Sequence, residues 1–166
     1  MQLKEFFDYK NQFVKDLLTH EELVTLIDPN HMYANPKDMV YDTVNPYEFY
    51  PETIEKGKVY VCCDVDVTDV GKRPYYGLAL YIWVFAHKSV LQLPSGGVRT
   101  DAICAEIDNV ISGSRLYGLG KLDLDYAKRF APMADYTGKV LRYVCTDFYR
   151  INDPTKPRPT NRKAGE

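Results

Sequence analysis

Acidic side chains give the strongest case for catalysis in this sequence. Asp64 and Asp66 lie two residues apart in an alternating stretch, so both point to the same face of a strand. Asp101, Glu106 and Asp108 fall in a stretch with helical spacing. Carboxylates that converge from a strand and a helix are how two-metal nucleases hold their ions. A metal-dependent nuclease using Asp64, Asp66 and Glu106 is therefore one hypothesis, and the solvent face of a half-exposed strand is the simpler one.

Other catalytic patterns are weaker. His87 ends an apolar stretch, but the sequence contains no Gly-x-Ser-x-Gly elbow with which it could act. Ser95-Gly96-Gly97 precedes a predicted helix and could contact an anion there, yet it lacks the spacing and the Lys-Ser/Thr pair of a phosphate-binding loop. We predict no catalytic, cofactor-binding or metal-binding residues, and hence no enzyme.

The four cysteines do not match a zinc pattern. Cys62 and Cys63 are adjacent, so on a strand their side chains point to opposite faces and cannot bind one metal as a Cys-x-x-Cys pair does. Cys104 and Cys145 each stand alone in an apolar stretch. We expect buried free thiols in a reducing compartment.

The hydrophobic pattern predicts an α+β fold: a small, mostly antiparallel sheet with two main helices packed on one face. Apolar residues recur at helical spacing over residues 2–18 and from Thr100 or Asp101 to Ser112. Thr19-His20-Glu21-Glu22 matches a capping box that would begin a short helix over Glu21–Ile27. The expected strands are Lys58–Thr68, Tyr76–Lys88, a short one at Leu122–Tyr126, and Lys139–Phe148, which gives the order α-β-β-α-β-β.

Two segments stand outside these elements. Residues 28–57 are rich in proline and tyrosine and keep no sustained period, which predicts a long loop that packs along its own domain or onto a neighbour. Residues 151–166 are basic and proline-rich and contain almost nothing apolar, which is typical of a flexible terminus or an interaction arm. We expect residues 1–150 to form a single domain.

Composition narrows the function classes. The formal net charge of −2 argues against a domain dedicated to nucleic-acid binding. The sequence has no apolar run near the ~20 residues of a membrane span, and its first residues do not resemble a signal peptide, so we expect folding in a cytoplasm. Fourteen tyrosines suit either a tyrosine-rich core and rim or a surface that is buried on assembly.

Several segments together resemble the small neck and tail-completion proteins of tailed bacteriophages, especially tail terminators. The resemblance covers about residues 2–150 as a general pattern rather than as a short motif. The segments that carry it are Glu48-Phe49-Tyr50-Pro51 continuing to Val59-Tyr60-Val61-Cys62, Trp83–Lys88 through Gly97–Asp101 to Glu106-Ile107-Asp108, and Leu116–Leu122.

The resemblance implies a virion structural subunit, assembled in the bacterial host cytoplasm, that forms a homo-oligomeric ring, commonly a hexamer. Such a ring caps the tail tube, joins it to the neck or head-completion proteins, and surrounds the passing DNA. No catalytic site is implied. The candidate inter-subunit residues are Tyr41, Tyr47, Phe49, Tyr50, Lys156 and Arg158, and the candidate basic residues facing the lumen are Arg99, Arg115 and Lys121.

Three alternatives remain beside the terminator hypothesis. A head-completion protein, of the stopper or adaptor type, would occupy another layer of the neck. A protein-binding adaptor unrelated to phage would be a monomer or dimer with a separate partner. A nuclease would lose activity but keep its fold after Asp64→Ala or Glu106→Ala.

Overall fold

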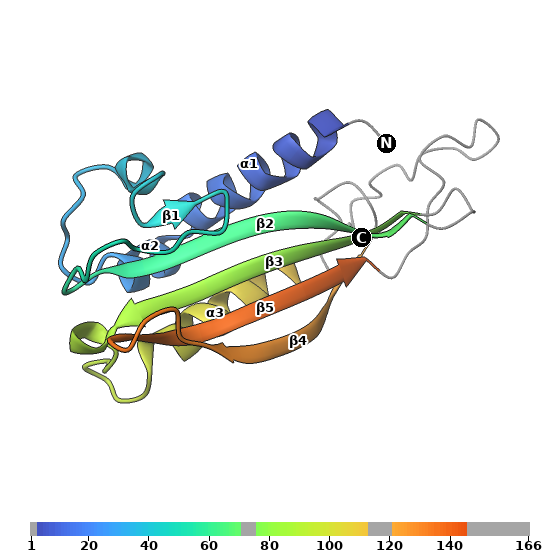
Figure 1. Ribbon diagram of the computed structural model, residues 1–166. Coiled ribbons are helices and arrows are strands. Elements are labelled where there is room, and N and C mark those ends of the chain that lie inside the picture. Colours follow the sequence, from blue (N-terminus) through green and yellow to red (C-terminus); the bar gives the residue numbers. More distant parts are fainter. Residues whose placement is uncertain (1–2, 71–75, 113–120, 146–166) are drawn as a thin grey trace, which may run out of the picture.

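The computed structural model describes residues 3–70, 76–112 and 121–145 (Figure 1). The predicted α+β class and the order of the main elements are confirmed. The helices are α1 (Leu3–Thr19), α2 (Glu21–Ile27) and α3 (Arg99–Ile111), with short 3-10 turns η1 (Pro36–Met39) and η2 (Lys88–Val90); the strands are β1 (Val44–Asn45), β2 (Val59–Val70), β3 (Tyr76–His87), β4 (Leu122–Phe130) and β5 (Tyr136–Cys145).

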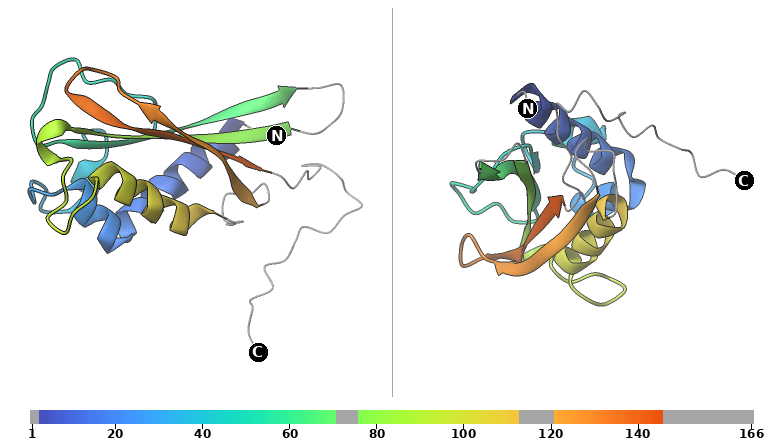
Figure 2. Two further views of the ribbon diagram at one scale, coloured as in Figure 1. Left: turned by 90° about the horizontal axis from the view of Figure 1, so that it is seen from below. Right: turned by 90° about the vertical axis from the view of Figure 1, so that its right-hand side faces the viewer.

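The strands form one sheet in the order β1-β2-β3-β5-β4. Short β1 runs parallel to β2, and the other neighbouring pairs are antiparallel. The helices all lie on one side of this sheet (Figure 2, left). The sheet therefore has a helix-covered face and an outer face.

The main core fills the space between the sheet and the helices. From β3, Leu80, Ile82, Val84 and Ala86 point to the helices, because alternate residues of a strand share a face. Each large apolar side chain buried there stabilises the fold by about 1.5–3 kcal/mol. The helical residues that meet them are Phe13, Val14 and Leu17 of α1, Leu23 and Ile27 of α2, and Ile103, Ile107 and Ile111 of α3.

Three of the cysteines are buried free thiols, as expected. Cys63 belongs to the main core and Cys62 to the outer face, so the predicted opposite orientation is confirmed. Burial raises the pKa of the Cys62 and Cys104 thiols to about 12, which keeps them protonated at neutral pH. The side chain of Cys145 lies outside the described residues.

Some local predictions were wrong. Thr19 does not cap α2: its hydroxyl donates to the Asp16 carbonyl oxygen at 3.1 Å within α1, and His20 occupies the N-cap position without a side-chain hydrogen bond. Strand β4 extends to Phe130, beyond the predicted Tyr126. Its last residues are mostly polar and do not indicate a strand by themselves, but they pair with β5. The loop 28–57 contains η1 and β1.

Gly138 on β5 lies against the backbone of β3. A Cβ atom at this position would lie 1.8 Å from the carbonyl oxygen of Val84 and 2.6 Å from the Cα of Phe85. Both contacts are with backbone, which cannot rotate away as a side chain can. The close approach of β5 to the centre of the sheet therefore requires glycine.

We expect Gly138→Ala to lower the free energy of unfolding by about 3 kcal/mol, because β5 must shift away from β3. Urea denaturation followed by circular dichroism measures this. Gly96→Ala is the control: Gly96 has a left-handed backbone, with φ of 92°, which Gly138 does not, and it has open space around its Cβ position. That variant should lose about 1–2 kcal/mol. Equal losses in the two variants would contradict the steric explanation.

Candidate assembly surface

A buried aromatic cluster lies on the outer face, at the end of the sheet where β2 begins. The Tyr60 and Phe85 rings stack with centroids 5.1 Å apart, and Tyr136 packs 5.9 Å from Phe85. Phe130 of β4 lies 5.6 Å from Phe85. Since the helices cover the opposite face, another part of the chain must shield these rings.

The loop between β1 and β2 provides that cover. Phe49 packs on Tyr60 with centroids 5.4 Å apart, and Tyr50 packs on Phe130 at 6.1 Å. The Tyr136 hydroxyl accepts a hydrogen bond from the Glu55 N–H at 2.8 Å, and lies 3.2 Å from the Glu55 carbonyl oxygen, to which it donates. The loop therefore packs along its own sheet, one of the two arrangements that the sequence allowed.

Three tyrosines of the wider segment 28–57 remain exposed, and we call them the loop tyrosines. Tyr41, Tyr47 and Tyr50 keep 71%, 40% and 51% of their surface accessible. The Tyr41 and Tyr47 rings stack at 6.5 Å with an interplanar angle of 26°. Of the predicted interface residues, these three are available for contact, whereas Phe49 is half-buried.

Tyr41 has a left-handed backbone, with φ of 67°. Such a conformation costs a non-glycine residue about 1–3 kcal/mol and persists where the surroundings impose it. Here the Tyr41 N–H donates to the Val44 carbonyl oxygen at 2.9 Å, and the side chains of Met39 and Val44 are buried in the core. The turn thus fixes the backbone from which the exposed Tyr41 ring projects.

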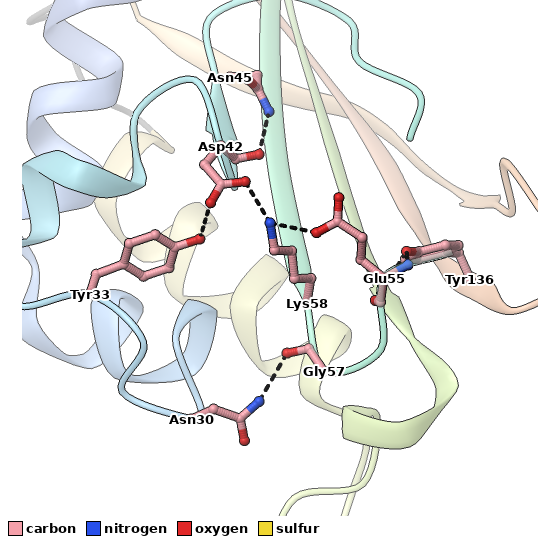
Figure 3. A network of polar contacts seen from close by, with 8 residues as sticks. All are labelled: Asn30, Tyr33, Asp42, Asn45, Glu55, Gly57, Lys58 and Tyr136. Carbon is pink, nitrogen blue, oxygen red and sulfur yellow. Dashed lines mark hydrogen bonds and ion pairs between the residues drawn. The ribbon is translucent and has the colours of Figure 1, made fainter. Parts of the chain in front are cut away.

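A polar network fixes the two ends of the loop (Figure 3). The Lys58 ammonium contacts Asp42 at 2.7 Å and Glu55 at 2.6 Å. The Tyr33 hydroxyl donates to the other Asp42 oxygen at 2.6 Å, and the Asn45 amide donates to the Asp42 carbonyl oxygen at 3.2 Å. Lys58, the residue just before β2, therefore forms ion pairs with Asp42 before β1 and with Glu55 near the end of the loop between β1 and β2.

The network shifts the pKa values of its members. Burial raises the pKa of Asp42, but hydrogen bonds from Lys58 and Tyr33 lower it more, so that it lies below the usual 3.8. Burial lowers the pKa of Lys58, but the two carboxylates raise it above its usual value. Burial and the bond to Asp42 raise the pKa of Tyr33 to about 12. At neutral pH the ion pair is therefore fully charged.

No helix of the described residues covers the remainder of the outer face. Strand pairing places Asp64, Tyr81, Arg142 and Tyr126 in one row across β2, β3, β5 and β4. The next row is Cys62, Trp83, Val140 and Lys128. We call the half-buried residues Tyr81, Trp83, Tyr126, Val140 and Arg142 the outer aromatic face.

The acidic residues do not assemble as the nuclease hypothesis requires. Asp64 and Asp66 follow Tyr60 and Cys62 on the outer face, whereas Glu106 belongs to α3 on the other side of the sheet. Asp64 is paired with Lys10 at 3.1 Å. Within residues 3–70, 76–112 and 121–145, no group of three His, Cys, Asp or Glu side chains could hold a metal ion.

The prediction that Arg99 faces a lumen was wrong. Its side chain is buried, and it donates to the carbonyl oxygens of Val90 at 2.7 Å and Leu26 at 3.2 Å. Arg99 therefore joins the chain before α3 to the end of α2. Lys121 is exposed and contacts Asp123 at 3.2 Å. Arg115, Lys156 and Arg158 lie outside the described residues.

Sequence reasoning missed the outer aromatic face. Tyr81 and Trp83 alternate within a stretch that is apolar on both sides, so the sequence does not show which side the helices leave open. Tyr126 and Arg142 join them through a strand order that brings β5 between β3 and β4. The alternation of aromatic residues in β3 was the one available signal.

A protein-family model described as YomW matches residues 9–145, which is most of the chain. The chain belongs to the YomW family. The family name is of phage origin, and this YomW-family protein is phage-related. The resemblance to phage proteins is thereby confirmed at the general level, without a position in the neck or tail. No curated protein and no solved structure matches the chain significantly.

None of the helices in the part of the chain that the structure describes is long and apolar enough to cross a bilayer.

We expect Asp42→Asn to lower the free energy of unfolding by about 1 kcal/mol at pH 7, because it removes one partner of the Lys58 ion pair. The lowered pKa of Asp42 means that its contribution is complete above 3.8 and is lost as the pH falls through the lower folded value. The difference in free energy of unfolding between variant and wild type should therefore shrink below pH 3.8. Urea denaturation at pH 7 and pH 3 measures it.

Asp38→Asn serves as the control, because Asp38 is an exposed acidic residue of the same loop. It should leave the urea midpoint nearly unchanged at both pH values. A constant difference between Asp42→Asn and wild type from pH 7 to pH 3 would contradict the role given to the Asp42 carboxylate.

Proposed function

We propose that this YomW-family protein is a virion structural protein of the phage head–tail junction, namely a tail-terminator or tail-completion ring subunit that joins the tail tube to the neck. The observation that carries the proposal is the set of exposed loop tyrosines on an ordered loop backbone. The phage-related family and the α+β fold are consistent with it.

Exposed tyrosines in a fixed loop favour a role in assembly. Tyrosine is enriched in protein interfaces because its ring supplies apolar contact area and its hydroxyl can still bond. A loop already ordered by Lys58, Met39 and Val44 loses little further freedom on binding, so more of the contact energy is available for association. Tyr41 and Tyr47 are therefore the expected anchors.

The two edges of the sheet favour a head-to-tail contact. The turn that carries Tyr41 leads into β1 at one edge, and β4 forms the other edge. On β4, Leu124 is an exposed apolar residue. A contact between two different edges is heterologous, and such contacts generate a ring when the rotation closes.

In this proposal the protein acts without catalysis, cofactor or membrane. Copies associate with one another, commonly as six in tail terminators, and with the tail tube and the neck or head-completion proteins. Lys121 at the start of β4 is a candidate for contact with DNA in the lumen. The protein would be assembled in the host cytoplasm and retained in the virion.

We expect the wild-type protein to form a closed ring and the double variant Tyr41→Ser/Tyr47→Ser to remain monomeric, because the two anchors are lost. Light scattering behind size exclusion measures the mass, with and without added divalent metal, which should have no effect. The circular dichroism melting temperature of the variant should stay close to that of wild type, since both rings are exposed.

Phe7→Ser provides the matched control, because Phe7 is an exposed aromatic residue on α1 rather than on the loop. It should assemble as wild type does. A wild-type protein that stays monomeric up to millimolar concentration would contradict the ring and favour a monomeric adaptor. Equal loss of assembly in the Phe7 and loop variants would contradict the role of the loop tyrosines.

A further inference from the structure

The outer aromatic face remains partly open in the described structure. The helices pack on the other side of the sheet (Figure 2, left). Phe49 packs on Tyr60 and Tyr50 packs on Phe130, in the row that contains Phe85. The next rows keep Tyr81, Trp83 and Tyr126 half-buried rather than buried. The described residues therefore do not fully cover the outer aromatic face, and a further segment of chain could pack on it.

The face presents flat rings beside one another. Tyr81 and Trp83 stack with centroids 5.8 Å apart and an interplanar angle of 19°. The Arg142 guanidinium lies 5.7 Å from the Tyr81 centroid and 6.0 Å from that of Tyr126, and its charge is paired with Asp125. Ordered aromatic surfaces of this kind bind proline-rich segments, which favour an extended conformation without internal hydrogen bonds.

An acidic rim borders these rings along β2. Asp64 pairs with Tyr81 in the register and forms an ion pair with Lys10, and Asp66 follows two residues later and is exposed. A proline-rich segment that also carries positive charge would fit the rings and this rim together.

The C-terminal sequence contains such a segment. Residues 152–160 hold three prolines, Pro154, Pro157 and Pro159, with Lys156 and Arg158 between them. Strand β5 ends at Cys145, three residues after Arg142. The eight residues 146–153 can span roughly 26 Å, which is ample for the segment to return over the neighbouring strands. Asn152-Asp153-Pro154 is a sequence that favours a turn.

We propose that residues 152–160 bind to the outer aromatic face of their own chain. The prolines lie on the rings of Tyr81, Trp83 and Tyr126, and Lys156 and Arg158 lie toward Asp64 and Asp66. A short tether keeps the segment at an effective concentration of about millimolar, which favours its own chain over a second copy. Lys156 and Arg158 then act within the subunit rather than between subunits.

Trp83 makes this proposal directly measurable, because it is the single tryptophan of the chain and lies in the face. We expect its fluorescence to be less quenched by acrylamide, and its emission maximum to lie at shorter wavelength, in the full chain than in a chain ending at Ile151. A synthetic peptide of residues 152–166 should reverse both changes in the shortened chain. The same peptide with its three prolines replaced by serine should not.

Tyr126→Ser in the full chain is the second variant, because Tyr126 is half-buried on an edge strand. Acrylamide should quench the Trp83 fluorescence of this variant as strongly as that of the shortened chain. Identical Trp83 fluorescence in the full and shortened chains, with no response to the peptide, would overturn the proposal. Protection that appears only as protein concentration rises would overturn binding within one chain and indicate exchange between copies.

These outcomes do not depend on ring formation. The double variant Tyr41→Ser/Tyr47→Ser is expected to be monomeric and to keep the protected Trp83, because its changes lie on the loop and not on the outer aromatic face. A full chain that forms rings but leaves Trp83 as accessible to acrylamide as in the shortened chain would overturn this inference alone. A protected Trp83 in a chain that never assembles would overturn the ring alone.

Discussion

The stacking of Tyr60 on Phe85 beneath Phe49 is the interaction on which the rest of the structure depends. Strand β3 is apolar on both faces, so packing the helices against Leu80, Ile82 and Val84 leaves Phe85 on the opposite side. Large rings left in water would forfeit about 1.5–3 kcal/mol each. The chain between β1 and β2 must therefore cross the outer face, and this requirement gives the long loop its path.

Buried apolar residues order the backbone that carries the exposed Tyr41. Burial of Met39 and Val44 stabilises the turn by an amount comparable with, or larger than, the strain at Tyr41. The Lys58 ion pairs join the loop ends, although exposed pairs of this kind contribute only about 1 kcal/mol. Apolar anchoring is thus the larger effect, and the ion pairs define position.

The sheet is covered unequally on its two sides, and this asymmetry gives the molecule its distinct surfaces. One side is closed by three helices, and the other is closed by a loop over part of its length. The loop tyrosines and the outer aromatic face are consequences of this incomplete cover. The phage-related family is consistent with the assembly role that we propose for these surfaces.

The sequence by itself determined the main helices and strands, the sidedness of β2 and the burial of three cysteines, because these follow from periods of 3.6 and two residues along the chain. It also indicated the loop tyrosines, since prolines and aromatic residues without a period predict a packed loop. Only the tertiary structure decided that Arg99 is buried, that Glu106 lies across the sheet from Asp64, and that Tyr81, Arg142 and Tyr126 form one row. Those relations depend on strand order and register, which are set by contacts between residues far apart in the chain and leave no local signal.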